Sequence, residues 1–186
     1  MRTFIAIEIP EEIKSRLADA QRDLSSFGVV DASWPNPEGI HLTLKFLGEV
    51  PESKVPDIIN GLQHAVGGIG LFRLEVGGIG TFPNPKNARV VWVGLSGDVE
   101  KLTSLQAAVE DALNSIGFNR DERSFTPHLT LGRIKYIRSR EKWLKALAEA
   151  KDIRPSGFDV AAISVIKSEL KPSGAVYTEI SRIDLK

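Results

Sequence analysis

The chain has 186 residues, enough for one domain or for two small lobes that share a core. Its 24 Lys and Arg residues equal its 24 Asp and Glu residues, so net charge does not indicate a nucleic-acid binder. The lack of cysteine excludes disulfides, thiolate nucleophiles and cysteine-ligated metals. No apolar run approaches a membrane span, and the acidic N-terminal residues do not fit a signal peptide. We therefore expect a globular protein of the cytoplasm that does not contact a membrane.

The first half of the chain predicts the order strand, helix, strand, helix, strand. Residues 4–9 are apolar and β-branched, and apolar residues then recur at helical spacing over 11–27. A loop rich in proline precedes an apolar strand over 40–48. A second helix is expected over about 51–66, and residues 71–76 alternate like a strand.

The second half repeats this order at a fixed offset. His41 and His128 are 87 positions apart, and the same shift aligns the strand at 89–95, a helix from Asp98, a helix around Trp143 and a strand over 158–165. A last strand is expected over 175–180. Such agreement predicts an internal duplication, with units of approximately 1–87 and 88–186 in a single bilobal domain. In a pseudo-twofold pair, matching residues face each other across the axis.

One tetrapeptide is identical in both units. His-Leu-Thr-Leu occupies 41–44 and again 128–131, and these words hold two of the three histidines. Alternation along a strand places His41 with Thr43, and His128 with Thr130, on the face opposite the leucines. Lys45 is expected to continue the face of His41, and Gly132 occupies its matching position.

Two histidines that converge on a cleft can form an acid–base pair, because imidazole titrates near neutrality. The hydroxyls of Thr43 and Thr130 could donate hydrogen bonds to the nonbridging oxygens of a phosphoryl group. In-line displacement at phosphorus needs a base behind the nucleophile and an acid at the leaving oxygen. A twofold pair of His-x-Thr motifs supplies both.

Other uses of these histidines have less support in the sequence. A buried histidine is often structural, but the presence of an identical tetrapeptide in two otherwise diverged units favours a functional role. Zinc usually takes a third protein ligand, and the histidines lack a metal-binding spacing. His64 is read as a solvated helix residue. Serine-nucleophile and phosphate-loop motifs are missing, and the Gly-Gly-Ile-Gly clusters at 67–70 and 77–80 are typical of turns and bulges.

With this pair of motifs, the whole chain resembles the 2H phosphoesterase superfamily. Within it, HLTLKFLGEV and TPHLTLGR are similar to segments of the RNA 2′,3′-cyclic phosphodiesterases, also called 2′-5′ RNA ligases. The resemblance implies an α+β fold of two lobes, each an antiparallel sheet backed by helices, with one motif per lobe at a central cleft. It also implies hydrolysis of RNA 2′,3′-cyclic phosphate ends to 2′-phosphates, without a metal or other cofactor.

The resemblance implies roles for individual residues. His128 would be the proton acceptor and His41 the proton donor, while Thr43 and Thr130 would hold the phosphate. Arg133 matches a common arginine of the second motif, so it is expected to contact phosphate, although it needs a bend at Gly132 or its own length to reach the histidine face. Further candidate nucleotide contacts are Lys45, Phe46 and Arg89, with Trp34 and Phe82 as additional candidates for base stacking.

Three functions stay open at this level. Intact histidines in both units favour a hydrolase over a non-catalytic RNA- or nucleotide-binding module. Ligation of RNA or tRNA halves is the reverse reaction at the same site, so the sequence does not separate it from hydrolysis. The expected partner is RNA with 2′,3′-cyclic phosphate ends, such as tRNA fragments or nucleotides, and the expected state of the protein is a monomer. The composition of the two motifs does not decide which histidine is the acid.

Overall fold

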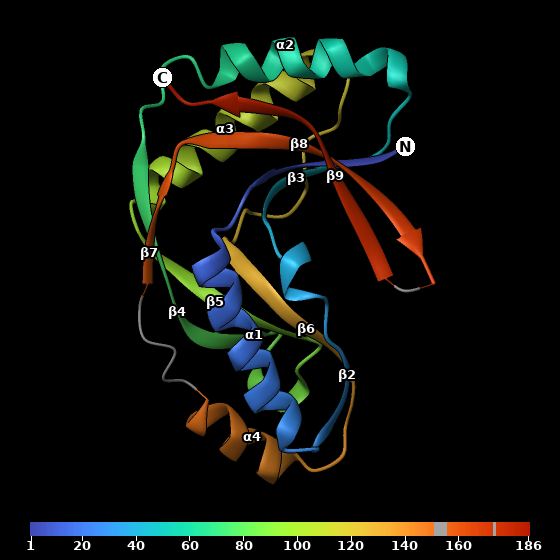
Figure 1. Ribbon diagram of the computed structural model, residues 1–186, viewed down its shortest axis with the longest axis vertical. Coiled ribbons are helices and arrows are strands. Elements are labelled where there is room, and N and C mark those ends of the chain that lie inside the picture. Colours follow the sequence, from blue (N-terminus) through green and yellow to red (C-terminus); the bar gives the residue numbers. More distant parts are fainter. Residues whose placement is uncertain (151–155, 173) are drawn as a thin grey trace.

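The computed structural model describes residues 1–150, 156–172 and 174–186, and it has an α+β fold with two antiparallel sheets (Figure 1). The helices are α1 (Glu11–Ser26), α2 (Val55–Ala65), α3 (Val99–Ser115) and α4 (Arg140–Glu149). Three short 3-10 turns are η1 (Pro37–Gly39), η2 (Glu52–Lys54) and η3 (Pro85–Asn87). The strands are β1 (Arg2–Ile7), β2 (Val30–Ser33), β3 (Leu42–Glu49), β4 (Phe72–Phe82), β5 (Val90–Gly97), β6 (His128–Ile137), β7 (Ser156–Val160), β8 (Ala162–Lys171) and β9 (Gly174–Asp184).

The two sheets have matching strand orders. Sheet A runs β3-β1-β8-β9, and sheet B runs β6-β5-β4-β7 with β2 added at its β6 edge. The 87-residue offset relates β1 to β5, β3 to β6, and β4 to β8. The predicted bilobal α+β fold is therefore confirmed, with α2 and α3 beside sheet A and α1 and α4 beside sheet B (Figure 1).

Each lobe combines elements from both halves of the sequence. Strand β4, from the first half, pairs with β5 in sheet B, and β8, from the second half, pairs with β1 in sheet A. The helices are exchanged between the lobes in the same way. Helix α1, from the first half, packs against β6, and α3, from the second half, packs against β3. Neither half of the sequence forms a lobe from its own elements, so the two units must fold together.

The leucines of both tetrapeptides belong to one continuous core. Leu42, Leu44, Leu129 and Leu131 are all buried, and the same apolar cluster extends through both sheets and all four helices. Removing each leucine side chain from water stabilises the fold by roughly 1.5–3 kcal/mol. This burial fixes the opposite face of each motif strand, which carries the histidine and the threonine, toward the space between the lobes.

Both motif strands contain a β-bulge at the same point of the repeat. Between β3 and β1 the register shifts so that Leu44 has no partner, and between β6 and β5 Leu131 has none. An extra residue in one strand reverses the inward–outward alternation beyond it. The third residue after each threonine, Phe46 in one strand and Arg133 in the other, is therefore exposed instead of buried.

This bulge corrects the expected position of Lys45. Its side chain points away from the histidine face and is only 1% exposed, with Nζ 2.8 Å from a carboxylate oxygen of Glu110 on α3. The same ammonium group donates a hydrogen bond of 2.9 Å to the carbonyl of Asn119. Lys45 therefore ties β3 to α3 and to the segment that leads into β6. The matching Gly132 is also buried, and a Cβ there would lie 2.6 Å from the Trp34 ring.

The structure differs from the sequence prediction at β7 and β8 and at β2, and it agrees with the prediction at the second glycine cluster. The predicted strand over 158–165 is in fact the two strands β7 and β8, which break at Ala161 and pair with different sheets. Strand β2 was not predicted, because its Asp31 and Ser33 make a short polar edge strand with little apolar pattern. The second glycine cluster forms a β-bulge at Gly78, whose φ of +70° suits glycine.

The buried ion pair gives a stability prediction. Lys45→Ala leaves the Glu110 carboxylate without its charged partner inside the protein, so we expect it to lower the free energy of unfolding by about 3–5 kcal/mol. Replacing both groups with apolar residues, as in Lys45→Met with Glu110→Leu, should recover most of this loss. Urea unfolding followed by circular dichroism measures both effects.

Lys54→Ala is the matched control, because it breaks an exposed pair in which Nζ lies 3.4 Å from Asp57. We expect a loss below about 1 kcal/mol there. If Lys45→Ala costs no more than this control, the buried pair does not have the structural importance assigned to it.

Candidate active site

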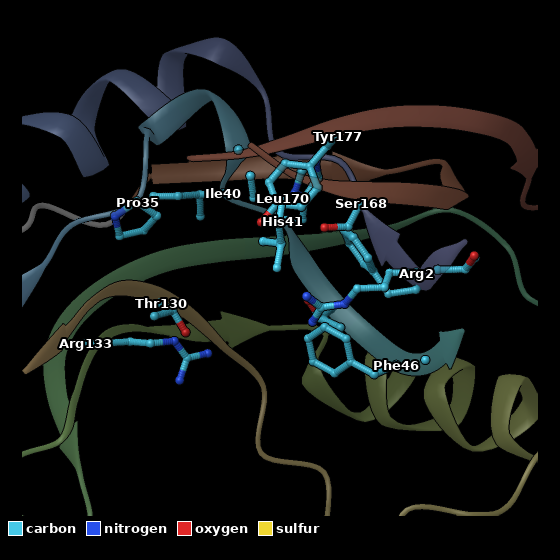
Figure 2. A pocket seen from close by; sticks show the side chains of 16 residues that line it. Arg2, Pro35, Ile40, His41, Phe46, Thr130, Arg133, Ser168, Leu170 and Tyr177 are labelled. Carbon is cyan, nitrogen blue, oxygen red and sulfur yellow. The ribbon is translucent and has the colours of Figure 1, made fainter. Parts of the chain in front are cut away.

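A cleft lies between the two sheets and is lined by both His-x-Thr motifs. One part of it is lined by His41 and Thr43 from sheet A together with His128 and Thr130 from sheet B, and has a volume of about 760 Å³. A volume of this size suits a nucleotide-sized ligand. Figure 2 shows the adjoining part, in which Thr130 lies across the pocket from His41. The structure thus brings together residues that are 87 positions apart in the sequence.

Two further predicted residues join the motifs in this cleft. Arg133 lines both parts of it and reaches the histidine face through the bulge that precedes Gly132. Phe46 also lines both parts, and it is 67% exposed. The exposed phenyl ring is available for a stacking contact with a bound base.

The other two predicted contacts are placed differently. Lys45 contributes to the cleft wall, but its ammonium group is directed to Glu110 and Asn119 rather than to a ligand. Arg89 lies outside the cleft, in a separate pocket, where its Nη1 donates a hydrogen bond of 3.2 Å to the Lys135 carbonyl. The expectation that Arg89 faces the cleft is therefore wrong, because its position at the start of β5 places it beside the far end of β6.

His41 is held by a carboxylate and two aromatic rings. Its side chain is only 7% exposed, and its Nε2 lies 3.4 Å from Oε1 of Glu8. The rings of Phe4 and Tyr177 meet it edge-on, with centroids at 5.7 and 5.0 Å. An ionised carboxylate only accepts hydrogen bonds, so Glu8 orients a ring whose Nε2 carries hydrogen.

The pKa of Glu8 lies below its ordinary value of 4.5. The main cause is the hydrogen bond with His41, and the positive charges of His41, Lys14 and Arg182 act in the same direction. Partial burial opposes them, because it disfavours the charged carboxylate. Glu8 is therefore ionised at the pH at which an imidazole titrates.

His128 has a different hydrogen-bond partner. Its Nδ1 lies 2.7 Å from the Thr126 carbonyl oxygen, which can only accept a hydrogen bond. Nδ1 therefore carries the hydrogen, and in the neutral ring Nε2 keeps a lone pair. The Phe82 ring contacts His128 edge-on at a centroid distance of 5.1 Å, with Trp92 at 6.3 Å. The surroundings of His41 thus require a hydrogen on Nε2, whereas those of His128 require a hydrogen on Nδ1.

Several residues of this site were not predicted from the sequence. Arg2 and Tyr177 line the cleft beside His41 (Figure 2), and Glu8 contacts His41 directly. Arg2 and Phe4 are two positions apart on β1 and therefore share a face of that strand. This pattern would have indicated Arg2 as a cleft residue if the pairing of β1 with β3 had been known. Tyr177 had no such signal, because nothing local indicates that β9 reaches the cleft.

The two aromatic candidates for base stacking lie at different places. Phe82 lines the cleft and contacts the His128 ring. Trp34 packs against the core, over the buried Gly132. Of the two, only Phe82 therefore has a position from which it could meet a ligand in the cleft.

Outside residues 151–155 and 173, no three His, Asp or Glu side chains gather in a way that could hold a metal ion. His64 is exposed on α2, as expected, and its Nδ1 lies 2.7 Å from the Asn60 carbonyl. Within the same described residues, none of the helices is both long and apolar enough to span a membrane.

Comparison with known proteins follows the same division of the chain. A family model described as LigT like Phosphoesterase matches residues 7–92 and, a second time, residues 93–177. The chain belongs to the LigT-like phosphoesterase family. The resemblance identified from the two motifs is thereby confirmed, and the repeated match is what a duplicated chain would give.

Relatives of this LigT-like phosphoesterase span nearly its whole length. It is 34% identical over 180 residues to an RNA 2′,3′-cyclic phosphodiesterase of Methanothermobacter thermautotrophicus, covering 97% of this chain and 96% of that protein. A protein of the same name from Thermotoga maritima is 37% identical over 177 residues, covering 95% and 91%. A crystal structure of a Thermus thermophilus protein has a TM-score of 0.75 at 30% identity, covering 100% and 98%. E. coli LigT complexed with 3′-AMP has a TM-score of 0.75 at 24% identity, covering 99% and 97%.

The contact between Glu8 and His41 gives a pH-dependent prediction for this LigT-like phosphoesterase. Because the folded-state pKa of Glu8 is lowered, its contribution to stability is complete above the unfolded pKa and is lost as the pH falls through the folded pKa. We expect Glu8→Gln to be less stable than the parent protein above about pH 5, with the difference closing at lower pH. Thermal unfolding across this range measures it.

Glu12→Gln controls for the loss of an exposed carboxylate, since Glu12 forms an ion pair with the exposed Arg16 at 3.3 Å. A stability difference for Glu8→Gln that is the same at every pH, or that equals the control, would contradict the proposed interaction.

Proposed function

We propose that this protein hydrolyses 2′,3′-cyclic phosphate ends of RNA to 2′-phosphates by acid–base catalysis with two histidines. The observation that carries this proposal is the convergence of His41 and His128 on one cleft, each beside a threonine hydroxyl. Relatives that are 34% and 37% identical over nearly the whole chain bear the name of this activity. The chain is accordingly a phosphoric diester hydrolase.

His128 acts as the base. With Nδ1 bound to the Thr126 carbonyl, the free lone pair on Nε2 removes a proton from water as the water oxygen attacks phosphorus. Attack in line with the bond from phosphorus to the 3′ oxygen breaks that bond. The phosphate then remains on the 2′ oxygen.

His41 acts as the acid. The departing 3′ oxygen needs a proton, and an imidazolium held by Glu8 through Nε2 can deliver it from Nδ1. After one turnover, His128 carries the proton taken from water and His41 has lost one, so a net transfer through solvent restores both. The different partners of the two rings thus support an assignment that motif composition leaves open.

Three neighbouring groups stabilise the negative charge that develops on the nonbridging oxygens of the phosphate. Thr43 and Thr130 flank the cleft from opposite sheets and donate their hydroxyl hydrogens to the nonbridging oxygens. Arg133 contributes a positive charge and fork-shaped donors that match a phosphate. Phe46 provides an exposed ring on which the base of the terminal nucleotide can stack.

The complete set of proton donors, acceptors and charges for this reaction comes from side chains. We therefore propose that hydrolysis proceeds without a metal or organic cofactor. We further propose that the protein acts as a monomer in the cytoplasm, on RNA ends such as those of tRNA fragments. We propose that ligation of RNA ends would use the same site, with a 5′ hydroxyl in the place of water: it attacks phosphorus, the bond to the 3′ oxygen breaks, and a 2′-5′ phosphodiester forms.

Replacing either histidine tests the mechanism. We expect His41→Ala and His128→Ala each to lower kcat on an RNA with a 2′,3′-cyclic phosphate end by about 10²–10⁴-fold, the usual contribution of a general acid or base. The assay contains a chelator, and His64→Ala is the matched control because that ring is exposed on α2. Chromatography of the product distinguishes a 2′-phosphate from a 3′-phosphate.

Full activity in either cleft variant, with unchanged folding by circular dichroism, would refute the two-histidine mechanism. Loss of parental activity in chelator would show that a metal takes part. RNA binding without turnover in the parent protein would favour the non-catalytic module.

A further inference from the structure

A compact group of positive charges lies outside the cleft, at the far end of β6. A pocket of about 190 Å³ there is lined by Lys86, Arg89, Lys135 and Arg140. All four residues are exposed, and no Asp or Glu lines the pocket. Within residues 1–150, 156–172 and 174–186, none of the four forms an ion pair with a carboxylate. Four uncompensated cations around one cavity create a strong local attraction for anions in a chain of zero net charge.

Hydrogen bonds hold part of this pocket in place. Arg89 donates from Nη1 to the Lys135 carbonyl at 3.2 Å, and Arg140 donates from Nη2 to Oδ1 of Asn87 at 3.4 Å. The η3 turn that carries Asn87 is anchored by the fully buried Trp143, whose Nε1 donates to the Pro85 carbonyl at 3.1 Å. The arginines are therefore partly ordered before any ligand arrives, which lowers the entropic cost of binding.

The repeat relates this pocket to the catalytic cleft. Adding 87 to Arg2 gives Arg89, and adding 87 to Gly48 gives Lys135. Arg2 and Gly48 line the sheet A end of the cleft, so the pocket is the equivalent position on sheet B. Lys135 also follows the cleft residue Arg133 by two positions, and both side chains are exposed with a buried residue between them. The pocket is separate from the cleft but adjacent to it along β6, because Arg133 lines the cleft and the next residue, Ile134, lines the pocket.

Distance sets which part of an RNA the pocket can contact. Lys135 is five residues beyond Thr130 on β6, and with the extra residue Leu131 in this stretch the span is roughly 13–17 Å. This span is longer than a single nucleotide. A phosphate at the pocket must therefore belong to a nucleotide upstream of the one whose cyclic phosphate lies between the histidines.

We propose that this pocket is a second phosphate-binding subsite, which takes the backbone of single-stranded RNA several nucleotides upstream of the reacting end. Tyr136 lines the same pocket and is 65% exposed, and an aromatic ring among cations is the combination that single-stranded nucleic acids bind. This inference rests on the proposed function and adds the way in which the enzyme selects an RNA strand over a cyclic mononucleotide.

The test compares two substrates on one variant. Lys135→Gln with Arg140→Gln removes two cations from the pocket without touching the cleft. For an oligonucleotide of about eight nucleotides with a 2′,3′-cyclic end, a length within the usual size of such sites, we expect kcat/KM to fall by roughly an order of magnitude at about 0.1 M salt. The logarithmic salt dependence should become shallower by about 0.7 per lost contact. Hydrolysis of a 2′,3′-cyclic mononucleotide should be unchanged.

Lys101→Gln, at an exposed position of α3, is the control for a lost surface cation. An equal effect on both substrates, no effect on the oligonucleotide, or the same effect in the control would overturn the subsite. Fluorescence anisotropy with an RNA that ends in a 3′-phosphate tests the subsite without catalysis. If the parent protein hydrolyses neither substrate, the proposed function fails, while weaker RNA binding by the double variant would still support the subsite.

Discussion

Each motif strand has an extra, unpaired residue directly after its threonine, and the geometry of the cleft depends on this constraint. These residues are Leu44 and Leu131, both buried in the core. Because apolar burial fixes them inward, the chain beyond them must reverse its alternation. The bulges direct Phe46 and Arg133 to the histidine face, while Lys45 and Gly132 turn inward. A regular strand would have placed a lysine beside His41 and buried the arginine.

We propose that an internal duplication produced the shared geometry, and that divergence of its two units produced the differences between the two sides of the cleft. The two units exchange strands and helices, so each sheet depends on the other half of the sequence for its core. On this common frame His41 faces the Glu8 carboxylate and His128 faces the Thr126 carbonyl. A carboxylate suits a ring that donates a proton, and a carbonyl at Nδ1 suits a ring that accepts one at Nε2.

The local sequence pattern was sufficient to predict much of the fold and to identify the two motifs. The helices and most strands followed from apolar periodicity, and the repeated His-x-Thr word identified the two histidines. Features that depend on pairing between distant strands were not predictable in this way. The bulges, the inward turn of Lys45, the exchange of β4 and β8, and the approach of Tyr177 from β9 all arise from such pairing. Arg89 was misplaced for the same reason, since its strand was known but its neighbours were not.

The most direct test of the account is a crystal structure with a nucleoside 2′-phosphate, the product of the proposed reaction, bound to the protein. The account predicts that the phosphorus atom lies between the rings of His41 and His128, with the hydroxyls of Thr43 and Thr130 hydrogen-bonded to its oxygens. The 3′ hydroxyl should lie on the side of His41. A phosphate bound away from both rings, or contacting one histidine with the other directed elsewhere, would contradict it.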